Sequence, residues 1–180
     1  MHQNQARAAS LLFRIRAMLL FYIAVLFASG ITAFPLNWEL AVLCDWFGNG
    51  TWAGDNIPGL ANWLARVKEG LDDNAAHYPF IAYGTDWLAF AHLMIGIAFL
   101  GPMIDPVKNL WIIYWGMICC VGILPLALIC GPMRSIPFGW QCIDCSFGVL
   151  GIIPLILVRR WVGQLQKMPP NEASPGNNVP

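Results

Sequence analysis

The sequence predicts an all-α, polytopic integral membrane protein whose spans pack as a four-helix bundle. The 180-residue chain is 58% hydrophobic and only 11% charged, whereas soluble domains carry about 25% charged residues. It also contains four apolar runs that approach or exceed the roughly 20 residues a membrane helix needs. The formal net charge is zero and no basic stripe is present, so we do not expect nucleic acid as a partner.

The first predicted span covers residues 17–36 and follows a cytoplasmic N-terminus of residues 1–16. Its segment AMLLFYIAVLFASGITAFPL contains no charged residue, and Arg14 and Arg16 precede it. A cleaved secretory signal peptide is the competing interpretation, because a basic start before an apolar run is typical of one. The run is longer than the usual signal-peptide core of about 7–15 residues, so we expect a span.

Three further spans are predicted, at residues 86–104, 110–130 and 143–160. We expect Thr85 or Asp86 to cap the start of the second span. Pro106 should end it, because proline has no backbone N–H to continue a helix, and Gly131-Pro132 should close the third. Backbone groups in lipid must be bonded within their own helix, so the spans are expected to pack as a bundle.

The placement of charges predicts the orientation of the spans. Seven basic residues fall on the side that holds both termini: Arg7, Arg14, Arg16, Lys108, Arg159, Arg160 and Lys167. Only Arg66, Lys68 and Arg134 fall on the opposite side, which also carries most of the acidic residues. Because basic residues are retained on the cytoplasmic side of a membrane, both ends of the chain are expected in the cytoplasm.

Residues 37–85 form the one large loop, which lies on the outer side in this topology. Apolar positions recur at helical spacing in PGLANWLARVKEGLDD, which predicts an amphipathic helix over residues 58–73 that starts at a proline. The tryptophans of the loop suit the headgroup level of a membrane, so this helix is expected to be interfacial. It is either a lid over an outer site or a segment that only caps the bundle.

The segment 163–180 is assigned to a disordered cytoplasmic tail. Its end, PPNEASPGNNVP, is rich in proline, asparagine and glycine. Such a composition offers little apolar surface to bury in a folded core.

The most specific local motif is Cys142-Ile143-Asp144-Cys145. Two thiols at this spacing can close a disulfide, and free N–H groups at a helix start favour the first thiolate. The negative charge of Asp144 opposes that effect. Cys142 and Cys145 are therefore candidate catalytic residues, and a chance motif or a static disulfide is the alternative. Cys119 and Cys120, by contrast, are interpreted as small buried apolar side chains.

A four-span bundle with a long first outer loop and C-I-x-C entering the fourth span resembles the vitamin K epoxide reductase family and the functionally similar DsbB proteins. The resemblance implies that electrons pass between the cysteine pair and a quinone, the only cofactor it indicates. Cys145 would then face the quinone, and Cys142 would exchange with a shuttle thiol. The chain departs from this pattern because that family has two cysteines in the loop and this loop has only Cys44.

A longer resemblance covers residues 78–155. The segments YPFIAYGTDWLAFAHLMIGIAFLGPMIDPVKNLW and IPFGWQCIDCSFGVLGIIPL are similar to a group of uncharacterised bacterial four-span proteins. The similarity implies a bacterial inner-membrane protein and carries no mechanism.

Four further residues are candidates for binding. His92 is the only histidine within a span, and an ionisable side chain at that depth is a functional candidate. Haem or a metal would need more ligands than the spans offer, so no metal site is expected, and a neutral imidazole bonded across helices is the simpler interpretation. At the outer end, Arg134 could pair with Asp86 or Asp144.

Three functions remain open from the sequence. We favour a structural or accessory role, with the lipid bilayer as partner and other membrane subunits or a second copy of the chain as further candidates. The first alternative is a thiol–disulfide oxidoreductase that couples Cys142 and Cys145 to a quinone. The second is a small transporter or a cofactor-binding membrane subunit, and whether the chain is an enzyme stays undecided.

Overall fold

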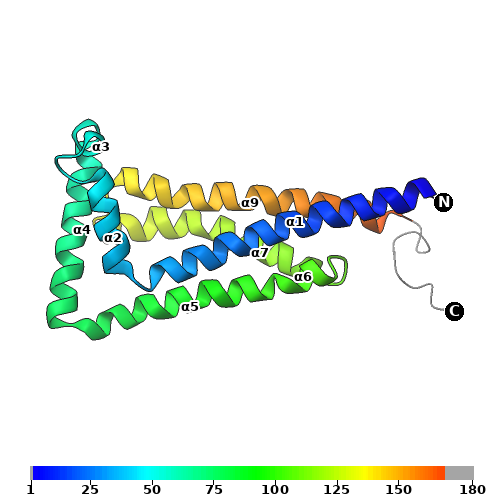
Figure 1. Cartoon of the computed structure of the whole chain (residues 1–180), viewed down its shortest axis with the longest axis horizontal. Helices are drawn as coiled ribbons and strands as arrows, with labels where there is room; N and C mark the ends of the chain where they lie inside the picture. Colours follow the sequence, from blue (N-terminus) through cyan, green and yellow to red (C-terminus); the bar gives the residue numbers. More distant parts are fainter. Residues whose placement is uncertain (1, 169–180) are drawn as a thin grey trace.

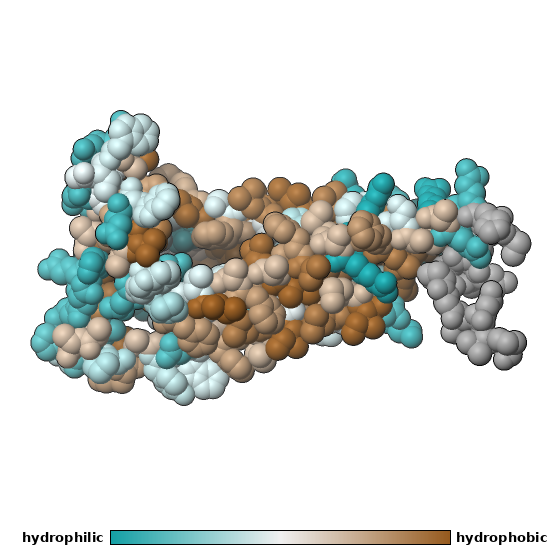
Figure 2. All heavy atoms as spheres, in the orientation of Figure 1, coloured by the Kyte–Doolittle hydropathy of each residue, from teal (hydrophilic) through white to brown (hydrophobic). Residues whose placement is uncertain are grey.

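A computed structural model of the chain describes residues 2–168, and every regular element in that range is a helix. Four helical segments are long and apolar enough to cross a membrane: Gln3–Ala33, Pro79–Ile104, Leu110–Met133 and Phe138–Gln166. Figure 2 shows hydrophobic residues over the middle of the visible face and hydrophilic residues gathered toward both ends. The predicted all-α membrane bundle is therefore confirmed.

The four spans are arranged as two helix pairs. One pair is α1 (His2–Ala33) with α5 (Tyr83–Ala98), and the other is α7 (Leu110–Pro125) with α9 (Phe138–Gln166). The pairs meet where α1 crosses α9, through a buried cluster that includes Ile15, Leu19, Leu155, Val158 and Val162. Beyond that crossing, α1 runs diagonally away from α9 toward α5 (Figure 1).

The two ends of the bundle differ. The N-terminus, the α6–α7 turn and the end of α9 lie at one end, which we call the terminal end (Figure 1). At the other, which we call the capped end, α2 (Leu36–Phe47), α3 (Trp52–Asn56) and α4 (Pro58–His77) run across the spans. The short helix η1 (Pro79–Ala82) then leads from α4 into α5.

The cap is held together by an apolar contact between α2 and α4. Leu40 of α2 and Ala61 and Leu64 of α4 are buried. Asn37 Nδ2 also donates to Asp72 Oδ1 at 3.4 Å. The helix expected over residues 58–73 is present; it starts at the predicted proline and continues to His77.

Prolines explain most of the interruptions in the helices. Pro35 cannot donate a backbone hydrogen bond, and α1 ends just before it at Ala33, so the first helix does not reach the expected Leu36. Pro102 lies after the break at Phe99 that separates α5 from α6 (Leu100–Ile104). In the third segment, α7 ends at Pro125 and is followed by the π-helix η2 (Leu126–Cys130) and α8 (Gly131–Met133).

Three boundary expectations are wrong. Thr85 and Asp86 do not cap the second span, because the helical segment already begins at Pro79. The fourth helix starts at Phe138 rather than near residue 143, since Pro137 provides its extended N-cap. It also continues to Gln166, so the first residues of the expected tail are helical. The remainder of that tail, residues 169–180, lies outside the described residues.

Glycines bring the paired helices close together. A Cβ at Gly148 of α9 would lie 2.5 Å from the carbonyl oxygen of Cys120 on α7. A Cβ at Gly30 of α1 would lie 2.9 Å from the carbonyl oxygen of Ala89 on α5. Small residues allow such close approach of helix backbones in membranes. A larger residue at either glycine would therefore push the two helices of that pair apart.

The turn between α6 and α7 is closed by its own polar side chains. Asp105 Oδ1 accepts from the backbone N–H of Lys108 at 3.0 Å, and Asn109 Nδ2 donates to the carbonyls of Gly101 and Asp105 at 3.1 and 3.0 Å. Asp105 and Asn109 therefore satisfy backbone groups at the ends of the two helices. The N–H of Lys108 is also the main reason that the pKa of the Asp105 carboxyl is lowered.

Candidate functional site

The Cys142 and Cys145 thiols lie one turn apart near the start of α9. Both are free thiols; Cys142 is exposed and Cys145 is half-buried. Because α9 begins at Phe138, Cys142 lies beyond the first turn, whose N–H groups are the free ones. The helix-start effect expected for its thiolate therefore does not apply at this position.

Cys119 and Cys120, which are adjacent on α7, differ from each other. Cys120 is buried and its Sγ lies 3.7 Å from the hydroxyl oxygen of Tyr22 on α1. Cys119 is exposed on the helix surface, so the interpretation of both as buried apolar side chains is wrong for Cys119. Adjacent residues on a helix point in directions roughly 100° apart, which explains the difference.

His92 is bonded within its own helix. Its Nδ1 lies 2.9 Å from the carbonyl oxygen of Leu88, and since a carbonyl can only accept, Nδ1 carries the proton. The hydrogen bond across helices expected for this imidazole is therefore not the one observed. Within residues 2–168, no three His, Cys, Asp or Glu side chains come together as a metal site would need.

The expected outer charge cluster is not assembled. Asp86 lies on α5 and Asp144 on α9, two helices that belong to different pairs. Arg134 follows α8 and is exposed, and none of the ion pairs among the described residues includes it. Asp144 is half-buried and shares a face with Gly148 one turn on, so it points toward the α7 side of its own pair.

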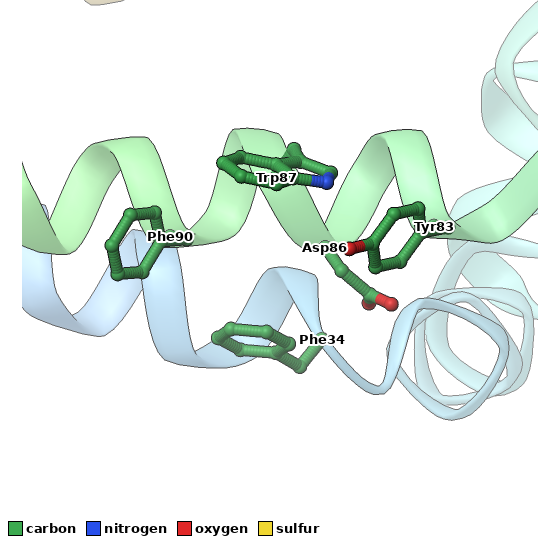
Figure 3. Close-up of a pocket in the computed structure, with 5 residues that line it drawn as sticks. All are labelled: Phe34, Tyr83, Asp86, Trp87 and Phe90. Carbon is green, nitrogen blue, oxygen red and sulfur yellow. The ribbon is translucent and has the colours of Figure 1, made fainter.

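Asp86 instead borders an aromatic groove between the end of α1 and the start of α5. Figure 3 shows its carboxylate extending from α5 toward the α1 chain, beside Phe34 and Tyr83. Trp87 and Phe90 complete the lining of this groove, which has a volume of about 280 Å³. A carboxylate next to aromatic faces attracts a cation, but the groove is shallow and open to its surroundings.

The more enclosed cavities lie under the cap, on either side of two tryptophans. Trp63 of α4 and Trp140 of α9 pack with ring centroids 6.4 Å apart. A cavity of about 410 Å³ lies on the α3–α4 side of this pair, and one of about 390 Å³ lies between α2, α4 and α9. Both are lined by Trp63, Trp140 and Ile143, and we refer to them together as the cap cavities.

The walls of the cap cavities are almost wholly apolar. The larger cavity is lined by Ile57, Leu60, prolyl and glycyl residues in addition to the shared tryptophans and Ile143. In the other, Glu39 is the one acidic residue among leucine, valine and aromatic side chains. Trp63 Nε1 is buried and has no hydrogen-bond partner among the described residues. An unpaired buried donor is costly, and the protein atoms that bury this one also keep it from the cavity space.

The cysteine pair does not face these cavities. Ile143 lines both, while Cys142 precedes it by roughly 100° around the helix axis and Cys145 lies nearly opposite. Neither thiol is among the residues that line either cavity. Neither sulfur atom therefore belongs to the wall of a cap cavity, although only Cys145 lies on the far side of α9.

Comparison with known proteins assigns no family. No family model, curated protein or solved structure matches the chain. The candidate site is therefore argued from its own geometry.

Sequence reasoning did not identify Trp63 and Trp140 as a pair. It placed Trp63 on the interfacial helix, where its apolar spacing belongs, and it did not single out Trp140. The contact joins α4 of the cap to the start of α9. The sequence contained one signal for this contact. Pro137 marks a helix start, and Trp140 follows three residues later.

Proposed function

We propose that this chain is a non-enzymatic accessory protein of the bacterial inner membrane that holds an apolar lipid chain beneath its α2–α4 cap. The pair of cap cavities around Trp63 carries this proposal. Their apolar walls suit a hydrocarbon chain. The acyl chain of a phospholipid and the tail of an isoprenoid quinone both have this chemistry.

The surface of α9 provides a route for such a chain. Ile143 lines both cavities yet is 41% exposed, and Phe147 lines the smaller one and is 64% exposed. Both lie on an apolar, membrane-length helix. The cavities therefore communicate with the surface that lipid would contact, so a chain can enter from the bilayer.

The orientation that we propose places both termini in the cytoplasm. Seven of the 10 basic residues belong to the terminal end, where positive charge is retained on the cytoplasmic side. We propose the bacterial inner membrane as the location, as the resemblance suggested by the sequence of residues 78–155 implies. A reporter fused after Gln166 should read as cytoplasmic, and periplasmic activity of that fusion would contradict the orientation.

The thiol–disulfide alternative retains one observation in its favour. Cys142 is exposed, and Cys145 follows three residues later on the same helix, a spacing that places the two side chains near each other. The position of both thiols away from the cap cavities favours lipid binding over electron transfer to a quinone held there. We therefore keep the oxidoreductase as the second candidate.

Photolabelling tests the proposed lipid site. The purified protein would be reconstituted with a phospholipid that carries a diazirine in its acyl chain, and separately with a diazirine analogue of an isoprenoid quinone. Labels in α4 and α9 peptides around Trp63 and Ile143 are expected, and the better probe identifies the source of the hydrocarbon chain. Labels spread evenly over all exposed apolar surfaces would contradict the proposal.

A matched pair of variants on α9 sharpens this test. Ile143→Trp fills space in both cavities, whereas Ile153→Trp makes the same change at a 48% exposed position that lines neither. The first variant should lose the labels near Trp63 and the second should keep them. Trp63→Phe replaces the indole with a smaller ring in the wall that both cavities share, and should weaken binding without abolishing it.

A further inference from the structure

A further pocket lies at the terminal end of the bundle, between the start of α7 and the end of α9. It has a volume of about 360 Å³ and is lined by Tyr114 of α7 and by Arg159, Arg160, Gly163 and Lys167 of α9, among others. We propose that it binds the phosphate headgroup of an anionic membrane phospholipid. This site is far along α9 from the cap cavities and does not rest on the proposed function.

The pocket concentrates positive charge without compensation. Arg159, Arg160 and Lys167 all line it, and no acidic residue does. None of the ion pairs among the described residues involves these three side chains. Basic pockets between membrane helices are a common form of anionic-lipid site, because a phosphate satisfies several cations at once.

The spacing on α9 gives the pocket its shape. Arg160, Gly163 and Lys167 are separated by three and four residues, so they follow one another along a single face of the helix. A Cβ at Gly163 would have no atom within 4 Å. The glycine therefore leaves open space between two cations, where a headgroup can approach the helix backbone.

Arg159 is already oriented for binding. Its Nε donates to the Tyr114 hydroxyl at 3.0 Å, and its guanidinium carbon lies 5.3 Å from the centroid of the same ring. A guanidinium has five N–H groups, so the terminal nitrogens remain for the two parallel bonds that arginine makes to phosphate. Holding the side chain in advance lowers the entropy lost on binding.

The surroundings identify a lipid as the source of the phosphate. Trp111 and Tyr114 on α7 are 65% and 42% exposed near the end of an apolar span. Aromatic rings with a polar edge are typical of the level where lipid headgroups lie. A phosphate in this pocket would therefore be carried at headgroup depth, with its acyl chains alongside α7 and α9.

Native mass spectrometry of the purified full chain, after removal of lipid, tests the proposal. The probes are phosphatidylglycerol, phosphatidylcholine with identical acyl chains, and inorganic phosphate. Identical chains make any contribution of the cap cavities equal, so the difference between the two lipids reports on the headgroup alone. Phosphatidylglycerol should bind more tightly than phosphatidylcholine, and inorganic phosphate should not displace it.

Two charge-matched variants complete the experiment. Arg160→Gln should lower the affinity for phosphatidylglycerol roughly fivefold, the effect expected for one basic residue near a lipid surface. Arg14→Gln removes the same charge from the same end of the molecule, lines none of the pockets described above, and should change little. Tyr114→Phe removes the hydroxyl that holds Arg159 without altering charge. It should weaken the binding of phosphatidylglycerol but not that of phosphatidylcholine. Equal effects of the two glutamine variants, equal binding of the two lipids, or displacement by phosphate would each overturn the proposal.

Discussion

Replacing single glycines with alanine should reveal how closely the helix pairs pack. At Gly148, the new methyl group would meet the backbone oxygen of Cys120 at 2.5 Å, and at Gly30 it would meet that of Ala89 at 2.9 Å. At Gly122, on α7, it would have no atom within 4 Å. The three sites thus form a graded series in which the chemical change is constant and only the space differs.

The expected magnitudes follow from two opposing terms. Alanine is favoured over glycine inside a helix by about 0.8–1.0 kcal/mol, which should stabilise Gly122→Ala. Overpacking a tight contact costs typically 1–3 kcal/mol. The cost at Gly148 should be near the upper value, because a backbone oxygen cannot rotate away as a side chain can. We expect Gly148→Ala to lower the free energy of unfolding by about 1–2 kcal/mol, with Gly30→Ala in between.

Unfolding of the purified variants in mixed micelles, followed by circular dichroism as the denaturing detergent increases, measures this order. Gly122→Ala serves as the control for helix propensity. Equal stability of Gly148→Ala and Gly122→Ala would show that α7 and α9 are not in backbone contact at Gly148. Such a result would refute the pairing on which the position of α9 depends.

Three other predictions concern the turns and the thiols. Ser135 has φ of 57°, which costs a residue with a Cβ roughly 1–2 kcal/mol, so Ser135→Gly should stabilise the fold in the same assay while Ser135→Ala should not. The N–H of Lys108 lowers the pKa of Asp105 below its ordinary 3.8. The ionised Asp105 carboxylate should therefore stabilise the fold above pH 3.8, and this stabilisation should be lost as pH falls through the lowered pKa. Asp105→Asn should abolish that pH dependence in a series of unfolding curves. Acid trapping with a heavy maleimide should show the same redox state of Cys142 with and without quinone; a disulfide that becomes reduced on quinone depletion would establish the oxidoreductase instead.

The spans could be predicted because the physics that selects them is local. A run of apolar residues of sufficient length is enough to indicate a membrane helix, and prolines mark where it breaks. The predicted helix ends were wrong where a helix continues beyond its apolar run. In α1 the buried Ala8, Leu11 and Ile15 recur at helical spacing before the predicted start at residue 17, so the periodicity was present outside the apolar window.

The candidate site could be predicted only in part, because it depends on which helix faces meet. The C-x-x-C spacing is visible in the sequence, but which face of α9 is covered, that of Ile143 or that of Cys142, depends on where the cap packs. The same holds for Asp86 and Arg134, whose opposite charges made a pair plausible although their helices are separated in the fold. Residue types are therefore a weaker guide to a membrane site than the direction in which each helix presents them.

The size of the cap cavities bears on what occupies them. At about 24 cal/mol per Å³, the 390 Å³ cavity beside α2 would cost roughly 9 kcal/mol if it were closed and empty. That cost is comparable to the entire stability of a typical domain, about 5–15 kcal/mol, so an empty cavity would favour collapse of the cap onto α9. The rings of Trp63 and Trp140 meet at an angle of 53° between α4 and α9 at this point, and the exposed Ile143 and Phe147 leave the space open toward the surface of α9. If the proposal is correct, we expect a hydrocarbon chain from the bilayer to fill this space and to cover its apolar walls.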